Sequence, residues 1–261
     1  MKQYKSIREL KALATMQMQN KFSTLIGAFL INFIVSYFIS ELSYLVIPTD
    51  TTMGNILNYI VAFIIQILIF VFNAGLYWLY LHAACNIPCK LSDLLYGFKN
   101  DTNKLIILSA IMTLIQVICL IPTQMIGRDL NILIAESETA ILNNTFTTEM
   151  RLTLFNALSR YTLVTSLCLL LNFLITLPLF PVFYIALDYP ALNIRTILTK
   201  SVSMMKGNKI KYILLQLSFI PMIFLLSIVT CGLALIWIIP YMHMTTTNFY
   251  LDISTKNKAT E

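Results

Sequence analysis

The sequence predicts an all-α fold: a polytopic membrane helical bundle of six transmembrane helices, with short amphipathic helices in the membrane interface. Composition is the first basis for this prediction, because 58% of the residues are hydrophobic and only 11% are charged, whereas a soluble domain has roughly 25% charged residues. The second basis is the recurrence of apolar stretches at least as long as the ~20 helical residues that cross a bilayer. We expect residues 1–261 to form a single integral membrane domain.

Four apolar stretches predict one transmembrane helix each, at about residues 22–47, 56–83, 105–126 and 161–187. A fifth stretch is about twice as long as one span requires and is interrupted by Thr230-Cys231-Gly232. Because glycine readily adopts the left-handed conformation that ends a helix, we predict two further helices joined by a tight turn, at about residues 212–230 and 233–251. His243 and the run Thr245–Asn248 make the second half of the last helix polar.

The distribution of Lys and Arg predicts the orientation, because these residues accumulate in cytoplasmic loops. Five precede the first helix, three lie between the second and third, five lie between the fourth and fifth, and two lie in the C-terminal tail, so fifteen of the 18 fall on one side. We therefore expect both termini in the cytoplasm. The first apolar run is about 26 residues long, which exceeds the about 7–15 residues of a cleavable signal-peptide core and predicts that this helix is retained.

A short amphipathic segment precedes the first, third and fifth membrane helices, at about residues 5–19, 91–99 and 191–205. Apolar residues recur along one face of each segment at helical spacing, as in helices that lie flat in the membrane interface. An Asn-Lys pair follows each segment: Asn20-Lys21, Asn103-Lys104 and Asn208-Lys209. Two interpretations remain open: a unit of one interfacial helix and one hairpin that occurs three times, or the ordinary tendency of loop-to-membrane junctions to collect polar residues.

The segment between the third and fourth membrane helices, residues 127–160, is the longest polar stretch of the chain and leans acidic. Asn143-Asn144-Thr145 within it favours a turn. We predict that both helices continue beyond the membrane and join near Asn143.

The densest basic cluster lies at the predicted cytoplasmic end of the fifth helix, where basic residues oppose crossing and attract anionic headgroups. Two aromatic residues of the last predicted helix are expected to face the same leaflet. The resulting candidate contacts for membrane lipids or a partner protein are Lys206, Gly207, Asn208, Lys209, Lys211, Trp237 and Tyr241. The alternative is that the lysines only anchor the topology.

Six amides within the predicted spans form a candidate intramembrane polar cluster: Asn32, Gln66, Asn73, Gln116, Asn172 and Gln216. Hydrogen bonding between helices is one role for such residues, and lining a substrate path is the other. Kinks are expected at the intramembrane prolines, most sharply in the sequence LPLFP at residues 177–181.

Motifs for catalysis or cofactor binding are not evident. The sequence has no Walker loop, no H-E-x-x-H and no G-x-S-x-G, so we expect neither an enzyme nor a cofactor. Cys85 and Cys89 flank a short loop with His82 nearby, but zinc sites usually draw four ligands from paired motifs, and no second pair exists. We expect no metal site and no nucleic-acid partner.

The C-terminal half resembles a known family. Its residues Ser201–Lys209, Thr230-Cys231-Gly232, Leu235–Tyr241 and Phe249-Tyr250 occur in the order of the motifs of the bacterial membrane-protein family called domain of unknown function 975, and the N-terminal IRELKALA is similar to the opening of that family. One departure is Pro221-Met222, where the family tends to carry a Gly-Trp pair. The resemblance covers nearly the whole chain and implies a six-span protein of Gram-positive bacteria, but no activity.

These observations predict a multi-pass protein of the bacterial cell membrane. The function expected first is that of a non-enzymatic accessory or scaffold protein of the cell envelope, in stress response, peptide immunity or partnership with a transporter. The alternative is a transporter of small molecules or lipids, or its permease subunit. Anionic lipid headgroups at the cytoplasmic face are the expected partners, together with a membrane protein or a second copy of the chain.

Overall fold

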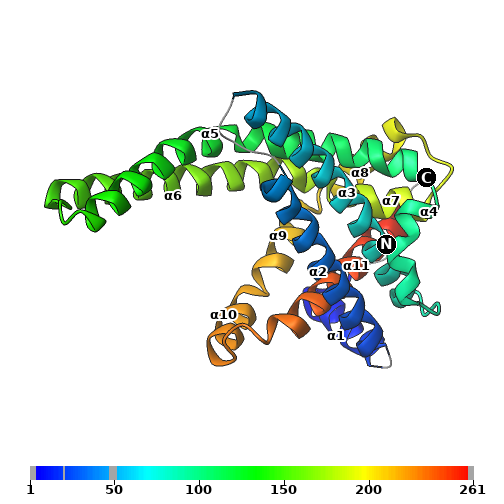
Figure 1. Cartoon of the computed structure of the whole chain (residues 1–261). Coiled ribbons are helices and arrows are strands. Elements are labelled where there is room, and N and C mark those ends of the chain that lie inside the picture. The colour runs from blue at the N-terminus through cyan, green and yellow to red at the C-terminus, as the bar shows by residue number, and fades with distance from the viewer. Residues whose placement is uncertain (1–3, 20, 47–51, 258–261) are drawn as a thin grey trace. The chain divides into compact units, whose positions relative to one another are not determined.

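A computed structural model describes residues 4–19, 21–46 and 52–257, and these residues form helices and turns without a strand. Four residues used in the sequence analysis lie outside the described ranges: Lys2, Asn20, Lys258 and Ile47, the predicted end of the first span. The helices, labelled in Figure 1, are α1 (Ile7–Met18), α2 (Phe22–Val46), α3 (Thr52–Ala84), η1 (Leu91–Leu95), α4 (Tyr96–Lys99), α5 (Thr102–Leu142), α6 (Thr148–Thr176), η2 (Leu177–Leu179), α7 (Val182–Asp188), α8 (Ile194–Met205), α9 (Lys209–Leu217), α10 (Ile220–Val229) and α11 (Leu235–Asn257).

Five helical stretches are long and apolar enough to cross a membrane: Phe22–Glu41, Ile56–Ala84, Thr102–Leu142, Thr148–Asp188 and Lys209–Val229. They overlap the first five predicted spans and indicate a membrane protein. Helix α11, which contains the sixth predicted span, is not among the candidates in the described part of the chain. Its polar second half lowers its hydropathy, so the sixth crossing stays a prediction.

The structure has turns at both positions where the sequence predicts them, near Asn143 and at Thr230-Cys231-Gly232. Helices α5 and α6 extend well beyond the length of a span and meet in a turn at residues 143–147, where Asn144 has a positive φ of 55°. Helix α6 stops at Thr176, before the two prolines of LPLFP, and the chain resumes as η2 and α7. Gly232 lies within the α10–α11 turn with a φ of 87°, a left-handed conformation that glycine adopts readily after a helix.

The amphipathic segments differ from one another. Helices α1 and α8 occupy the first and third, and each buries one face, with Leu10, Ala14 and Met18 on α1. The second segment is not one continuous helix but the short helices η1 and α4. Leu94 is buried there, whereas Leu91 and Leu95 are close to half exposed. That these segments lie in the membrane interface stays a prediction.

The chain divides into two compact units. Unit 1 comprises Met1–Ala110 and Pro178–Glu261, and unit 2 comprises Ile111–Leu177.

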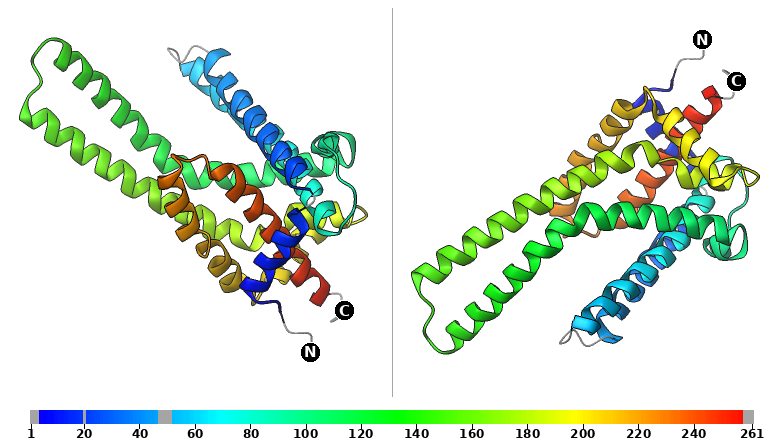
Figure 2. Two further views of the ribbon diagram at one scale, coloured as in Figure 1. Left: turned by 90° about the horizontal axis from the view of Figure 1, so that it is seen from below. Right: turned by 90° about the horizontal axis from the view of Figure 1, so that it is seen from above.

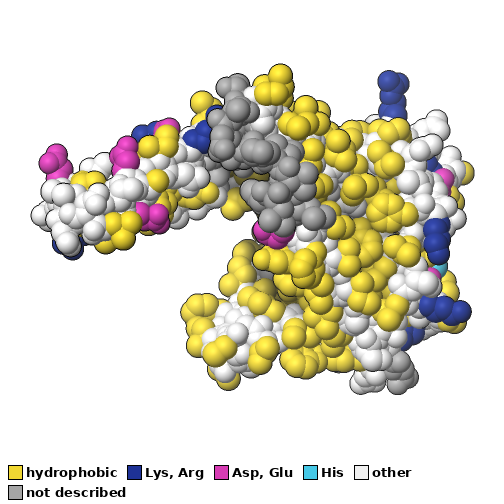
Figure 3. Space-filling model, in the orientation of Figure 1, with side chains coloured by type: hydrophobic (Ala, Val, Ile, Leu, Met, Phe, Trp, Pro, Cys, Tyr) yellow, Lys and Arg dark blue, Asp and Glu magenta, His cyan; other side chains and the backbone are white. Residues whose placement is uncertain are grey.

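In unit 1, helices α3 and α11 are central. Helix α2 pairs along α3, α1 packs on α11, and η1, α4 and α7 pack on α3, as both views of Figure 2 show for α1 and the last turns of α11. The core joins small and large apolar side chains from several elements, including Ala14, Leu25, Leu79, Tyr80 and Met244. Figure 3 shows hydrophobic side chains covering this face of unit 1, with Lys and Arg along its right-hand edge.

Two glycines let the η1–α4 segment lie directly on α3. A Cβ atom on Gly75 of α3 would stand 1.9 Å from the carbonyl oxygen of Leu94, and one on Gly97 of α4 would stand 2.5 Å from that of Val71. Trp78 of α3 also stacks on Tyr96, with ring centroids 3.9 Å apart. The segment is therefore fixed to α3 by backbone contact as well as by side chains.

Unit 2 is a hairpin of two antiparallel helices formed by α5 and α6. Gly127 faces Tyr161, whose ring carbon would be 3.3 Å from an added Cβ. Gln116 lies 11 residues before Gly127, and Asn172 lies 11 residues after Tyr161. Both are therefore about three turns from this contact, in the same direction along the antiparallel pair, and lie at one level of the hairpin.

Candidate functional site

The family-like segment Ser201–Lys209 forms a helix end and a turn. Met205 is fully buried at the end of α8, Gly207 has a φ of 85°, and the side-chain amide of Asn208 donates a hydrogen bond of 2.8 Å to the carbonyl of Met204. Ser201 donates to the carbonyl of Pro178 at 2.8 Å. The residues that the sequence singles out here therefore shape the turn and attach α8 to η2.

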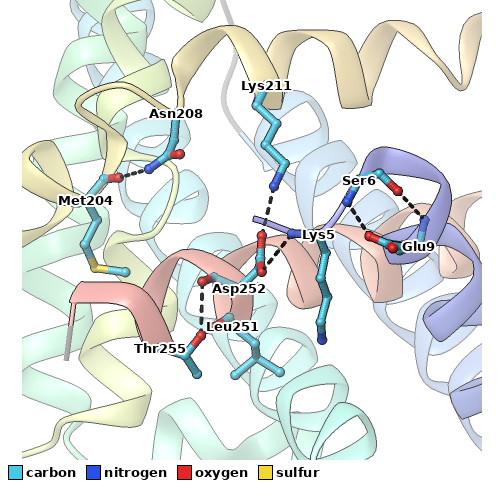
Figure 4. A network of polar contacts seen from close by, with 9 residues as sticks. All are labelled: Lys5, Ser6, Glu9, Met204, Asn208, Lys211, Leu251, Asp252 and Thr255. Carbon is cyan, nitrogen blue, oxygen red and sulfur yellow. Dashed lines mark hydrogen bonds and ion pairs between the residues drawn. The ribbon is translucent and has the colours of Figure 1, made fainter. Parts of the chain in front are cut away.

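The three lysines of the basic cluster have different environments. Lys206 and Lys209 are exposed, whereas Lys211 forms a salt bridge of 2.9 Å with Asp252 of α11. The other carboxylate oxygen of Asp252 accepts a hydrogen bond of 3.4 Å from the backbone N–H of Lys5. Figure 4 shows this junction, which joins the N-terminal segment, the first turn of α9 and the last turns of α11.

A lysine closes each of the three helical hairpins. Lys21, at the start of α2, donates to the carbonyl of Ala83 near the end of α3 at 3.0 Å. Lys104, at the start of α5, donates to the carbonyl of Pro190 just after α7, and Lys211 performs the same role from α9 to α11. Carbonyls at helix C-termini lack helical partners and carry partial negative charge, so they attract cations. Lysines that sequence reasoning assigns to topology thus also bind within the molecule.

Trp237 and Tyr241 lie close together, and their neighbours are residues of α1 and α10. They line a largely apolar groove of about 360 Å³, together with Thr15, Met18, Gln19, Phe22, Met222, Leu226 and Ile238. The Tyr241 hydroxyl donates to the carbonyl of Lys11 at 3.4 Å. The ammonium of Lys11 in turn donates to the carbonyl of Ser218 at 2.9 Å and lies 4.1 Å from the ring centroid of Phe219. The groove therefore has a cation beside it that sequence reasoning did not select.

The six intramembrane amides do not form one cluster within a single unit. Asn32, Gln66, Asn73 and Gln216 belong to unit 1, whereas Gln116 and Asn172 belong to unit 2. Among the described residues, no hydrogen bond joins any two of the four in unit 1 or the two in unit 2. The side-chain nitrogens of Asn32 and Asn172 are buried without a hydrogen-bond partner in the described structure.

The polar run of α11 lies in the core of unit 1. Thr245 and Thr247 are fully buried, and each hydroxyl donates to the helix carbonyl four residues earlier. Thr247 also contacts the hydroxyl of Tyr184 at 3.1 Å, and Asn248 donates to Gln17 of α1 at 2.7 Å. The polar residues of this run bond to polar groups of the surrounding helices, such as Tyr184 and Gln17. A hydropathy scale applied to one segment does not detect such partners.

Tyr184 and Tyr250 were missed by sequence reasoning. Their rings stack with centroids 4.9 Å apart, and Tyr250 donates a hydrogen bond of 2.9 Å to Asp188 at the end of α7. His243 lies next to this group, with its ring centroid 5.3 Å from that of Tyr80. The available signals were the family-like pair Phe249-Tyr250 and the position of Asp188 directly before Tyr189-Pro190.

Cys85 and Cys89 are free thiols. Burial raises the pKa of the Cys89 thiol, which disfavours the thiolate that a metal requires. Within the described ranges, no group of three His, Cys, Asp or Glu side chains gathers closely enough to hold a metal ion.

The tip of unit 2 combines carboxylates with exposed apolar side chains. A groove of about 260 Å³ near the turn is lined by Glu136 and Glu149 over Leu133, Met150 and Leu154, among others. The exposed apolar residues around it include Ile132, Ile141, Leu142, Leu152 and Phe155, and Leu142 is 81% exposed. From residue 130 to residue 150 the chain has three Glu and neither Lys nor Arg. Arg128 and Arg151 border this stretch on either side.

Comparison with known proteins agrees with the resemblance noted in the sequence. Residues 1–257 match the model of a family described as "Protein of unknown function (DUF975)", which confirms the expected family. No curated protein and no solved structure matches the chain.

Proposed function

We propose that this chain, which belongs to the DUF975 family of proteins of unknown function, is a multi-pass protein of the bacterial cell membrane that works as a non-enzymatic accessory or scaffold protein of the cell envelope. In this proposal both termini are cytoplasmic and the tip of unit 2 lies outside. The protein acts by binding a partner there, in stress response, peptide immunity or support of a transporter.

The tip of unit 2 is the observation that carries this proposal. Helix α5 has 41 residues, about twice the length that crosses a bilayer, so about half of it is free to extend beyond the membrane. An extramembrane helix pair that exposes Leu142 and Phe155 leaves apolar area in water, and such patches usually mark interaction sites. The nearby Glu136, Glu138 and Glu149 favour a partner segment that presents Lys or Arg beside apolar residues.

The interior of unit 1 supports binding over catalysis or transport. Several of its buried polar groups are engaged with one another, as in the contacts of Tyr184 with Thr247, Tyr250 with Asp188 and Lys211 with Asp252. Groups satisfied in this way stabilise a core.

Photo-crosslinking in intact cells tests the proposal. A photoreactive residue at position 142 or 155 should yield an adduct with a distinct protein, and the same residue at position 53, which is 75% exposed in unit 1, should not. Replacing Glu136, Glu138 and Glu149 together with Gln should remove the adduct while the variant remains folded. Adducts only with a second copy of the chain would make it a homo-oligomer instead, and adducts that persist in the triple variant would exclude the acidic tip.

A transporter or permease subunit is the alternative, and the hairpin seam of unit 2 favours it. The hydroxyls of Thr123 and Thr165 and the amide nitrogen of Asn172 are buried without partners in the described structure, at levels that also include Gln116. If these groups line a path, replacing Gln116 and Asn172 with Leu should abolish uptake or export in vesicles. If they only pack the hairpin, the double variant should keep its partner adduct.

A further inference from the structure

The groove between α1, α10 and α11 has the features of a lipid site. Its walls are apolar or aromatic except for Thr15 and Gln19, and its volume of about 360 Å³ lies in the range of about 300–1,000 Å³ found for small-molecule sites. Phe22 is 39%, Leu226 41% and Trp237 51% exposed, so the groove is open at its side. The flanking helices α2 and α10 are apolar enough to lie in a membrane, which would place acyl chains at that opening.

The cations beside the groove define the headgroup. Thr15 lines the groove, and Arg8 and Lys11 lie seven and four residues earlier on the same face of α1. Lys11 is half-buried and uses one of its three N–H donors on the carbonyl of Ser218. Among the described residues, Lys11 has no carboxylate within salt-bridge distance.

Burial lowers the pKa of Lys11, which means that its positive charge lacks full compensation in this environment. An anion beside Lys11 would supply that compensation and would use its free donors.

We propose that the groove binds one acyl chain of an anionic glycerophospholipid, with Lys11 and Arg8 holding the phosphate. Met18, Phe22, Met222 and Ile238 then contact the chain, and Trp237 covers it at the open side. The site is separate from the basic turn at Lys206–Lys209, and it lies in unit 1, so it does not depend on the partner surface proposed for unit 2.

The two tryptophans of the chain make a direct test possible. Trp78→Phe leaves Trp237 as the only tryptophan and keeps an aromatic ring against Tyr96. The full chain is reconstituted in phosphatidylcholine vesicles that contain either phosphatidylglycerol or phosphatidylcholine brominated on the acyl chain. Brominated phosphatidylglycerol should quench Trp237 at a lower mole fraction than brominated phosphatidylcholine.

Matched variants locate the interaction. Lys11→Gln and, separately, Arg8→Gln should each weaken the preference about fivefold, the effect of one basic residue near an anionic headgroup. Lys11→Arg should keep it, and Lys209→Gln, which removes an exposed charge of the basic turn, should leave it unchanged. Thr15→Phe should fill the groove and reduce quenching by both lipids.

Three results would overturn the proposal. The first is equal quenching of Trp237 by the two lipids, and the second is a preference for phosphatidylglycerol that survives both Lys11→Gln and Arg8→Gln. The third is a loss of that preference in Lys209→Gln as large as in Lys11→Gln. Arg8 is exposed, so its replacement tests the headgroup even if Lys11→Gln fails to fold.

Discussion

Units 1 and 2 satisfy their polar side chains in different ways. In unit 1, some hydroxyls bond within their own helix, as Thr245 does to Tyr241, but other hydrogen bonds join residues far apart in sequence, such as Asn248 with Gln17 over 231 positions and Lys21 with Ala83 over 62. In unit 2, the hydroxyls of Ser137, Thr162 and Ser166 bond to the carbonyl four residues earlier in the same helix.

This difference follows from the number of neighbours that each helix has. Within unit 1, a helix is surrounded by others of the same unit and can exchange hydrogen bonds with them, whereas within unit 2 each helix has one neighbouring helix. Bonding back to its own backbone leaves no polar group exposed to lipid. Unit 1 should therefore be sensitive to single substitutions and unit 2 tolerant of them.

The largest contrast is expected between glycines of the two units. Gly75→Ala in unit 1 would force a Cβ into the backbone of Leu94, so we expect a loss of about 3 kcal/mol or more, at the upper end of overpacking costs. Gly127→Ala in unit 2 meets only a ring atom of Tyr161, which can move, and should change stability by less than about 1 kcal/mol. Thermal unfolding of the purified chain in one detergent measures both.

Gly27→Ala is the control within unit 1, because its nearest neighbour would be a side-chain carbon of Leu91 at 3.7 Å, an ordinary contact. Equal losses for Gly75→Ala and Gly127→Ala would contradict the comparison.

The next effect concerns the lysines of the basic cluster. Lys211→Gln breaks a salt bridge whose side chains are 20% and 9% exposed. We expect a loss of about 2 kcal/mol, between the values for exposed and fully buried pairs. Lys209→Gln should have little effect on stability, since that side chain is exposed. If the two variants unfold at the same temperature, Lys211 is only a topological anchor.

A smaller effect is expected at the turn before α9. Gly207 has a φ of 85°, and the space within 4 Å of the position that a Cβ atom would take is open. Gly207→Val should therefore cost about 1–2 kcal/mol through backbone strain alone. Gly207→Asn, which tolerates this conformation better, should recover most of the folded yield in size-exclusion chromatography. Similar yields for Val and Asn would show that the turn changes conformation instead.

The smallest effect is a pH dependence at the start of α1. The backbone N–H of Ser6 donates to Glu9 at 2.6 Å, and this bond, followed by that of the Ser6 hydroxyl, lowers the pKa of Glu9. A carboxylate with a lowered pKa stabilises the folded state above its unfolded pKa, and this contribution is lost as the pH falls through its folded pKa. The difference in melting temperature between wild type and Glu9→Ala should thus narrow from pH 7 to about pH 3. A difference in melting temperature that stays constant with pH would show that the charge of Glu9 does not contribute to stability.

The helices and their ends were accessible from sequence because their signals are local. Gly232, LPLFP and the Asn143–Asn144 turn act through the backbone of their own neighbourhood. The partners of the lysines could not be predicted from sequence, because Ala83, Pro190 and Asp252 lie at the opposite ends of their hairpins. The first two accept through backbone carbonyls, which have no signature in the sequence. The same holds for the groove, whose lining comes from four helices.

The polar run of α11 shows a different limit. Thr245–Asn248 suggested a weak membrane helix, since hydropathy scales assume that a segment faces lipid. In the structure its neighbours include Tyr184 and Gln17, so its polar residues are surrounded by protein rather than by lipid. That Gln116 and Asn172 lie at one level of unit 2 depends on the register of the hairpin, so it could not be predicted from their occurrence in two spans.

The packing of α1 on α11 sets an order of events during biosynthesis. Gln17 is translated 231 residues before Asn248, which corresponds to roughly 12–46 s at about 5–20 residues per second. During that interval Leu10, Ala14 and Met18 have no α11 to cover them, and the membrane surface is the nearest apolar phase. Helix α1 therefore leaves the ribosome well before α11 and completes its packing only after α11 is made, so a nascent chain arrested before α11 should leave α1 open to added protease.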